Sequence, residues 1–332
     1  MEKYTQFRDR ASGIAPFLPI VGQIQPVSFL FHLFLFCLRL PLLLSACIMY
    51  FTILQWLPVR SLVMKVSLWI TLGISGIWWI DLQIEGVRRG SLAQHSSRLP
   101  HPGTVIASSF TSPFDALCLA AIFNPIFTIS YPSTRKVRQI SLLQAIFHAF
   151  SVPQLDPPPS ATLTDIVTLL KRHPNRCVAV FPECTTTNGK GILQLSPSLI
   201  TTSPETKIFP ISLRYTPADI TTPVPRTYFS FLWNLLSKPT HYIRVRIAEP
   251  ITVKRAIESA ESAWPSSSNA QGRRIMDEDR ILKSEDPLST VQDALLEQVA
   301  EALARLGRVK RVGLGVHEKK QFVVMWTKGK RR

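Results

Sequence analysis

Charged residues are scarce in this sequence, and acidic residues most of all. Charged side chains make up 18% of the 332 residues, below the roughly 25% of ordinary soluble domains. Asp and Glu number 22 against 38 Lys and Arg, which gives a net charge of +16. Hydrophobic residues reach 46%, enough for a large core, so a disordered, collagen-like or coiled-coil chain is excluded. The positive charge favours anionic partners: membrane surfaces, nucleic acid or phosphate-bearing small molecules.

Cysteine is also rare, and its spacing excludes the usual metal and disulfide patterns. The chain has five cysteines, Cys37, Cys47, Cys118, Cys177 and Cys184. Their number is odd and none forms a C-x-x-C pair, so we expect neither a zinc site nor a disulfide framework. Free thiols are typical of a reducing compartment, which indicates a cytosolic location or the cytosolic face of a membrane.

Charge is missing above all from the N-terminal part, where two long apolar runs occur. Val27–Leu57 is interrupted by His32 and Arg39, and its second part has 18 residues without a charge, near the minimum for a bilayer span. Val66–Ile80 is the second run, and its three tryptophans suit a membrane–water interface. Two helices buried in a soluble core are the alternative.

Basic residues flank this pair of runs on both sides. Both flanks would lie on the cytosolic side of a hairpin. We therefore expect a helical hairpin over residues 27–82, re-entrant or monotopic, that holds the chain on the cytosolic leaflet. Residues 1–26 contain no apolar core of a signal peptide and are expected to form a cytosolic N-terminal segment.

Short apolar strands alternate with helices in the rest of the chain. The patterns predict strands at 104–107, 126–131, 177–181, 207–214 and 241–247, and helices at 116–123, 139–150, 164–171 and 288–306. This alternation predicts an α/β domain over residues 83–255, with a largely parallel sheet flanked by helices. Residues 256–287 are charged and Ser-rich, which indicates a flexible insertion. Residues 288–332 are expected to form a C-terminal helix and a basic tail.

The tail carries half of the net charge. From residue 307 onward there is one acid, Glu318, against nine bases, which are Arg308, Lys310, Arg311, Lys319, Lys320, Lys328, Lys330, Arg331 and Arg332. Phe322 and Trp326 are too few aromatic residues to form a stacking platform for nucleic acid. We therefore expect the tail to contact an anionic lipid surface and no nucleic acid.

The segment Phe181–Gly191, with the sequence FPECTTTNGKG, is the most informative. It follows a buried strand, so it lies at the carboxyl edge of the sheet, where α/β proteins bind ligands. Its threonines, glycines and Lys190 offer O–H, N–H and ammonium donors to a phosphate. The spacing of a P-loop is absent. A polar turn without a ligand is the alternative.

Together these segments resemble the glycerolipid acyltransferase family, the 1-acylglycerol-3-phosphate (lysophosphatidic acid) acyltransferases, over about residues 86–250. The family's first motif, Asn-His-x-Ser-x-x-Asp, is similar to Ser109–Asp115, and its third motif, Phe-Pro-Glu-Gly-Thr, to Phe181–Thr185. Its fourth motif and closing strand are similar to Ile208–Ile211 and Arg244–Pro250. The whole chain is similar to the fungal lysophosphatidic acid:oleoyl-CoA acyltransferase subgroup linked to lipid droplets and vacuolar sorting.

Two positions depart from the family motifs. Phe110 stands where the family has a catalytic His, a general base whose help is worth about 10²- to 10⁴-fold. Asp115 remains, and burial would raise the pKa of its carboxyl toward neutrality. His101 and His148 are candidates to replace the missing base. Cys184 stands where the family has Gly, either as a tolerated small residue or as a covalent acyl carrier.

The resemblance implies an acyltransferase that moves a fatty acyl group from acyl-CoA to a lysophospholipid, first of all lysophosphatidic acid. It implies that the protein lies at the cytosolic face of the endoplasmic reticulum membrane and on lipid droplets. It also implies that the reaction needs no metal or prosthetic group. Asp115 is the implied catalytic residue, and the implied substrate-binding residues are Ser112, Glu183, Cys184, Thr185, Thr186 and Lys190. The alternative is a non-catalytic lipid-binding or sorting factor that kept the fold but lost the base.

Overall fold

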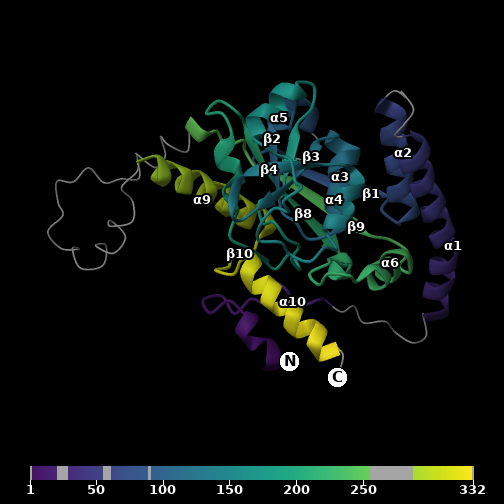
Figure 1. Ribbon diagram of the computed structural model, residues 1–332. Helices are drawn as coiled ribbons and strands as arrows, with labels where there is room; N and C mark the ends of the chain where they lie inside the picture. The colour runs from purple at the N-terminus through teal and green to yellow at the C-terminus, as the bar shows by residue number, and fades with distance from the viewer. Residues whose placement is uncertain (1, 21–28, 55–60, 89–90, 255–286, 331–332) are drawn as a thin grey trace.

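The computed structural model describes residues 2–20, 29–54, 61–88, 91–254 and 287–330. It contains one large sheet with helices on both faces, and a helical pair to one side (Figure 1). The flexible insertion predicted for 256–287 lies outside the described residues, apart from Pro287.

The large sheet has eight strands in the order β1-β9-β8-β2-β6-β3-β4-β5. Their bounds are β1 Trp79–Ile84, β2 Val105–Ser108, β3 Ile126–Tyr131, β4 Thr134–Ile140, β5 Leu163–Thr164, β6 Val178–Val180, β8 Ile208–Thr216 and β9 Tyr242–Ile247. Pairs β1/β9, β8/β2, β2/β6 and β6/β3 are parallel, whereas β9/β8, β3/β4 and β4/β5 are antiparallel. The sheet is therefore mixed with a parallel centre, and the predicted α/β class is confirmed.

Three strands of the large sheet were not predicted from the sequence: β1, β4 and the two-residue β5. The helix formed by the second apolar run ends at Ile74, and β1 begins at Trp79. The predicted boundary of the hairpin at residue 82 is therefore wrong. β1 extends that run without a break in hydropathy, and its identity depends on parallel pairing with β9. β4 was also missed, and the helix predicted at 139–150 begins only after it, at Leu142. β4 forms because it pairs with β3 across a tight turn.

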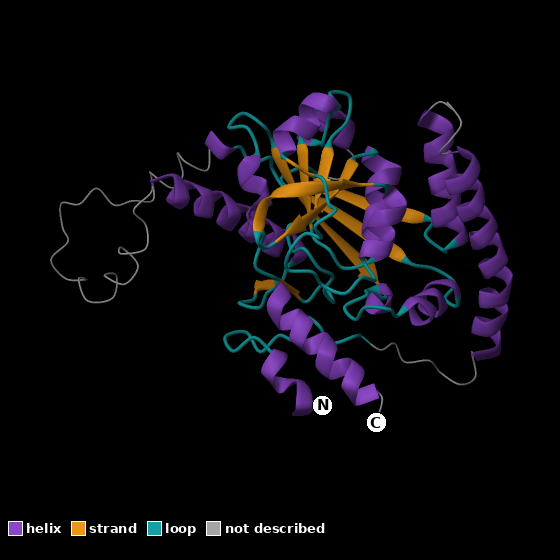
Figure 2. Ribbon diagram, in the orientation of Figure 1, coloured by secondary structure: helices purple, strands orange, loops and turns teal. Residues whose placement is uncertain are grey.

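The helices divide the core into two layers (Figure 2). On one face, α3 (Pro113–Phe123), α4 (Leu142–His148) and α6 (Tyr228–Leu236) pack with α1 (Phe29–Ile48) and α2 (Ser61–Ile74). On the other face, α5 (Ile166–Arg172) and α9 (Pro287–Gly307) bury Leu169, Val299 and Leu303 against β2 and β6. Short helical turns occupy η3 (Met49–Leu54), η4 (Leu92–Arg98), η5 (Pro197–Thr201) and η6 (Ala218–Ile220). The central strands are therefore buried on both faces, as their continuous apolar runs predicted.

Helices α1 and α2 form the expected apolar pair. Within the described residues, Phe29–Ile53 is the one helix long and apolar enough to cross a membrane. The 14 residues of α2 are too few for a span. Large apolar side chains are exposed on both helices, among them Leu30, Phe34, Leu62 and Ile70. This outer surface supports the predicted membrane contact.

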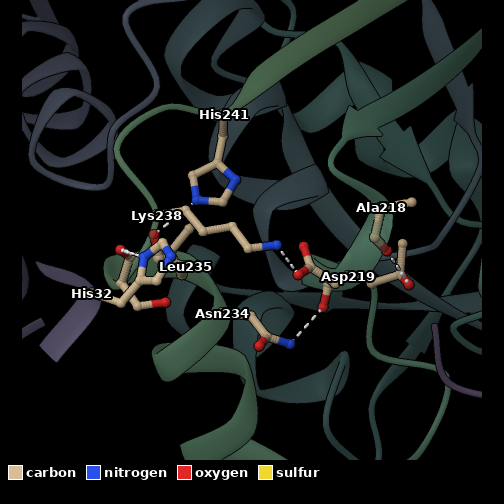
Figure 3. Close-up of polar contacts among 9 residues, drawn as sticks. His32, Ala218, Asp219, Asn234, Leu235, Lys238 and His241 are labelled. Atoms are coloured by element: carbon tan, nitrogen blue, oxygen red, sulfur yellow. Dashed lines mark hydrogen bonds and ion pairs between the residues drawn. The ribbon is translucent and has the colours of Figure 1, made fainter. Parts of the chain in front are cut away.

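Polar groups fasten α1 to the α/β domain (Figure 3). His32 Nδ1 lies 2.6 Å from the Ser237 carbonyl, and Arg39 donates to the Lys238 carbonyl at 2.6 Å. Lys238 in turn pairs with Asp219 of η6. These contacts explain why an apolar helix carries a histidine and an arginine, since both side chains bind carbonyls that follow α6.

The two ends of the chain pack together, as Figure 1 shows. Helix α10 (Val316–Lys330) lies against η1 (Glu2–Phe7), and the rings of Tyr4 and Phe322 are 5.6 Å apart between centroids. β10 (Lys310–Arg311) pairs in parallel with β7 (Gly191–Ile192) in a second sheet. The tail thus completes a core through its apolar side chains, which the sequence analysis did not predict, and the expected contact of its basic residues with an anionic lipid surface stays a prediction.

Candidate active site

Asp115 lies at the start of α3, directly after the loop that leaves the central strand β2. Its Oδ2 accepts from the Thr111 and Ser112 main-chain N–H groups at 2.6 and 2.9 Å, and its Oδ1 accepts from the Tyr215 hydroxyl at 2.5 Å. Ser112 and Asp115 together form a capping box, which begins the helix here. The carboxyl group is 0% exposed, and this burial raises its pKa to about 6 despite these donors.

Phe110 occupies the position next to this loop where a base would be needed. Its ring is buried between Phe181 and His148, with centroid distances of 4.5 and 5.8 Å. His148, the last residue of α4, is half-buried, and its Nδ1 lies 3.1 Å from the Ser151 hydroxyl. Burial, reinforced by Lys319 and Arg138, lowers its pKa to about 4, so this imidazole is neutral at physiological pH.

The other candidate base lies elsewhere. His101 precedes β2, whereas Phe110 follows it, so the two residues lie at opposite ends of the strand. The His101 ring packs near Phe209 instead, with 6.1 Å between centroids. Of the two histidines proposed as replacements, the structure therefore brings His148 to the motif and leaves His101 away from it.

Glu183 joins the two sequence motifs. Its Oε1 accepts from the Phe110 N–H and its Oε2 from the Leu193 N–H, both at 3.2 Å. The side chain is 0% exposed, and burial raises its pKa to about 8. Both oxygens thus accept from main-chain N–H groups, and the buried side chain is not open to a substrate. The expected role of Glu183 in binding substrate is not met, and it holds the loop against the first motif instead.

Both termini hold the loop that contains Thr186 and Asn188. Lys319 of α10 donates to the Thr186 carbonyl and hydroxyl, although it is only 1% exposed. Burial lowers the pKa of Lys319 to about 7, with Glu183 acting in the opposite direction. From the N-terminal segment, the Ala15 and Leu18 carbonyls accept from the Asn188 amide at 2.8 and 2.9 Å. Sequence analysis missed these contacts, because the basic composition of the tail concealed a buried lysine.

Two cavities lie on either side of the start of α3. The first is apolar, measures about 330 Å³ and is lined by residues such as Leu43 of α1, Leu68 of α2, Phe114 and Leu117 of α3 and Phe231 of α6. The second is polar, measures about 110 Å³ and is lined by Thr111, Thr187, Asn188, Gly189, Lys190 and Arg214, among others. The Thr111 hydroxyl, 3.2 Å from Asp115 Oδ2, connects the buried carboxyl group to the polar cavity.

Two proteins of known name are similar in sequence to most of this chain. A Schizosaccharomyces pombe protein, whose name ascribes to it lysophosphatidic acid:oleoyl-CoA acyltransferase activity, is 31% identical over 83% of this chain and 94% of its own length. The chain belongs to the lysophosphatidic acid acyltransferase family. Lysophosphatidic acid:oleoyl-CoA acyltransferase 1 of Saccharomyces cerevisiae is 25% identical over 79% of the chain and 88% of its own length. No protein-family model matches the chain.

Among the solved structures that align with this lysophosphatidic acid acyltransferase family member is an enzyme from a bacterium. It is the 1-acyl-sn-glycerophosphate acyltransferase PlsC from Thermotoga maritima, 13% identical, with a TM-score of 0.37 over 84% of this chain and 97% of that one. Because this superposition is loose, the family assignment rests on the fission yeast relative. Membership confirms the expectation that the chain is an acyltransferase.

Cys184 shows why the family motif has glycine at this position. Its φ is +57°, in the left-handed region that side chains avoid. Burial raises the pKa of its thiol to about 12, so a reactive thiolate is disfavoured. The geometry favours a tolerated small residue over a covalent acyl carrier.

Few of the other predicted substrate-binding side chains are open to a ligand. The Ser112 hydroxyl donates to the Ile220 carbonyl, and the Thr186 hydroxyl donates to the Thr222 carbonyl. Thr185 is buried as well, whereas Lys190 is exposed and lines the polar cavity. Lys190 is therefore the predicted residue with direct access to a substrate, and the neighbouring residues fix the shape of the loop.

This division of roles gives a paired prediction. Glu183→Gln should lower the free energy of unfolding by about 1–3 kcal/mol, because an amide NH₂ group would face one of the two buried main-chain N–H donors. Lys190→Ala should leave the melting temperature unchanged and raise the KM for the lysophospholipid. Thermal unfolding and steady-state kinetics on both variants check this. A Glu183→Gln protein of native stability would contradict the role assigned to the carboxyl group.

Proposed function

We propose that the protein transfers the acyl group of an acyl-CoA to the free hydroxyl of lysophosphatidic acid and so forms phosphatidic acid. The names of both fungal relatives support the choice of acyl acceptor and of a CoA donor. Lysophospholipids and acyl-CoA are the partners, and the chemistry of ester formation requires no metal or prosthetic group.

One observation carries this proposal: the amino end of α3 separates the apolar cavity from the polar one. Pro113 and Phe114 line the first, whereas Thr111 lines the second. A fatty acyl chain loses contact with water in the apolar cavity, where each buried methylene contributes about 0.8 kcal/mol. A phosphate finds hydroxyl, main-chain and lysine donors in the polar cavity. Asp115 lies between the two, where an acyl ester is made.

The reaction requires a proton to leave the acceptor hydroxyl as its oxygen attacks the thioester carbonyl. The C–S bond then breaks, and the CoA thiolate takes up a proton. Asp115 accepts the proton from the alcohol through the Thr111 hydroxyl, which donates to its Oδ2, and returns it to the thiolate by the same route. The pKa of about 6 caused by burial makes this carboxylate a better base than an exposed aspartate while leaving it ionised at neutral pH.

A pH profile tests the role of this carboxyl group. Because the carboxylate is the form that accepts a proton, kcat/KM should rise with pH through about 6 and level off above it. Tyr215→Phe removes a donor that lowers this pKa, so the acid limb of the profile should move to higher pH. Rates measured from pH 5 to 8 on both proteins check the shift. An acid limb that stays in place would exclude Asp115 as the titrating group.

We further propose that the protein acts at the cytosolic face of the endoplasmic reticulum membrane and on lipid droplets. The apolar outer surface of α1 and α2 supports membrane attachment, and the net charge of +16 supports an anionic lipid surface as partner. Localisation of a fluorescent fusion, together with extraction by high salt and by detergent, tests this. Release by salt alone would show that the helices are not the anchor.

The deciding experiment is an assay of the purified full-length protein in lipid nanodiscs. Labelled oleoyl-CoA is supplied with lysophosphatidic acid, lysophosphatidylcholine or lysophosphatidylethanolamine, and the labelled product is identified. We expect phosphatidic acid as the main product. Phe110 favours the second candidate, a non-catalytic lipid-binding or sorting factor. Binding of lysophosphatidic acid without transfer of the oleoyl group to any of the three acceptors would select that alternative.

A further inference from the structure

The edge of the sheet formed by β1, β9 and β8 carries three rows of side chains on one face. The strand register sets the rows, and alternate residues of a strand point to the same side. Read from β1 through β9 to β8, the rows are Trp79–Tyr242–Thr216, Asp81–Arg244–Arg214 and Gln83–Arg246–Ser212. We call this surface the arginine face. Ile243 and Val245, which alternate with these residues, are buried in the core on the other side.

The arginines are fixed by the end of α9. Arg214 donates to the Gly307 carbonyl at 3.2 Å, and Arg246 donates to the Leu306 carbonyl at 2.8 Å. These carbonyls end the helix, where cations are favoured. Arg308 follows directly, so α9 adds a fourth guanidinium to the arginine face. The side chains are therefore oriented before any ligand arrives.

The four arginines of the arginine face carry more positive charge than the neighbouring Asp81 can neutralise. Arg244 pairs with Asp81 at 3.0 Å. Burial lowers the pKa of Arg246, and the adjacent Arg308, Arg244 and Arg214 lower it further, with Asp81 opposing. Like charges brought this close repel one another, and an anion bound between them would relieve the repulsion.

Two hollows give a ligand room on this face. One measures about 600 Å³ and is lined by Trp79, Tyr242, Arg214 and Arg244, among others. The other measures about 380 Å³ and includes Arg88, Arg246 and Arg308. Trp79 and Tyr242 are 71% and 61% exposed. Each guanidinium carries five N–H donors, more than the contacts to α9 and β1 occupy.

The arginine face continues into the candidate active site. Arg214 lines both the larger hollow and the polar cavity that contains Lys190. Tyr215, which binds Asp115, points to the opposite face of the sheet, so the connection runs through the polar cavity, which both Arg214 and Thr111 line. Neighbouring strands are about 4.8 Å apart, so β9 and β1 lie one and two such steps from β8. A long ligand with its reactive group at Asp115 would reach the arginines.

We propose that the arginine face binds the adenosine 3′,5′-bisphosphate end of CoA. The adenine stacks on Trp79 and Tyr242, and the 3′-phosphate and diphosphate are held by Arg214, Arg244, Arg246 and Arg308. This assignment rests on the proposed function, because it names the part of the site that holds the donor. A phosphate monoester of lipid needs one or two such donors and no aromatic surface, whereas CoA offers several phosphate groups and a planar base.

Calorimetry with adenosine 3′,5′-bisphosphate tests the site without turnover. The full-length protein in nanodiscs of neutral lipid is titrated, and Arg244→Ala and Trp79→Leu should each weaken binding roughly tenfold, the usual effect of losing a charge-assisted hydrogen bond or a stacked base. Arg172→Ala, an exposed arginine at the end of α5, is the charge-matched control and should bind as the wild type does. Arg244→Lys keeps the charge without the forked geometry and should bind with intermediate affinity.

Steady-state kinetics and vesicle binding separate the two sources of phosphate. Arg244→Ala should raise the KM for oleoyl-CoA roughly tenfold and leave the KM for lysophosphatidic acid unchanged, with a native melting temperature. The proposal would be overturned if Arg244→Ala bound adenosine 3′,5′-bisphosphate as the wild type does. It would also be overturned if Arg244→Ala lost adsorption to phosphatidic acid vesicles and kept nucleotide binding. Wild-type protein that binds the bisphosphate but transfers no acyl group would refute the proposed function and leave this inference standing.

Discussion

Asp115→Asn is expected to reduce acyl transfer by at least about 10²-fold, the scale of general-base catalysis. Asparagine keeps the size of aspartate but accepts no proton at neutral pH. Because the native carboxylate accepts from two main-chain N–H groups and the Tyr215 hydroxyl, the amide will also lose one acceptor. We expect a cost of about 1–3 kcal/mol in the free energy of unfolding.

A control must match this loss of stability without touching the carboxylate. Ser112→Ala serves, because Ser112 is the N-cap of α3 and its hydroxyl donates to the Ile220 carbonyl. Removing such a cap costs about 0.5–2 kcal/mol. Measured below the melting temperature of both variants, Ser112→Ala should retain most of the wild-type kcat. Equal losses of kcat in the two variants would show that Asp115 has a structural role and no catalytic one.

Phe110→His combined with Tyr215→Phe should raise kcat by as much as about 10²- to 10⁴-fold, whereas Phe110→His alone should give little. In the native protein Tyr215 occupies Asp115 Oδ1 and main-chain groups occupy Oδ2, so a new imidazole finds no free acceptor. Removing the Tyr215 hydroxyl frees Oδ1 to orient the ring. The stacking of residue 110 between Phe181 and His148 leaves room for an imidazole of similar shape.

A double-mutant cycle measures this coupling. The kcat and the free energy of unfolding are determined for the wild type, both single variants and the double variant. Phe110→His alone should be about 1–3 kcal/mol less stable, because its buried N–H lacks a partner, and the second substitution should recover part of this loss. Strictly additive effects on both quantities would mean that residue 110 does not reach Asp115.

The sequence was sufficient to predict that each of the two motifs follows a strand, whereas the structure showed that these strands are neighbours. Ser109–Asp115 and Phe181–Gly191 each follow an apolar strand, and the pairing of β2 with β6 is parallel. Carboxyl ends of adjacent parallel strands share one edge of the sheet, so the meeting of Phe110 with Glu183 follows from topology alone. The apolar N-terminal pair was predicted for a similar reason, because hydropathy over a run of residues is a local property.

The residues that complete the site could not be predicted from local sequence patterns. Tyr215 contacts Asp115 across 100 positions of the chain, and Lys319 contacts Thr186 across 133. A lysine within a basic stretch gives no periodic signal of burial, and a tyrosine in a strand is ordinary. The same holds for β1, whose apolar residues were indistinguishable from the end of the preceding helix until β9 provided a partner.

The dependence of the loop on α10 has a consequence for how the protein matures. Lys319 is synthesised long after α1 and α2, and after every strand of the large sheet. α1 and α2 are synthesised first, so they can enter a bilayer while the Thr186 loop has not yet received its lysine. A chain cut short before residue 319 would therefore reach the membrane without the lysine that holds the Thr186 loop.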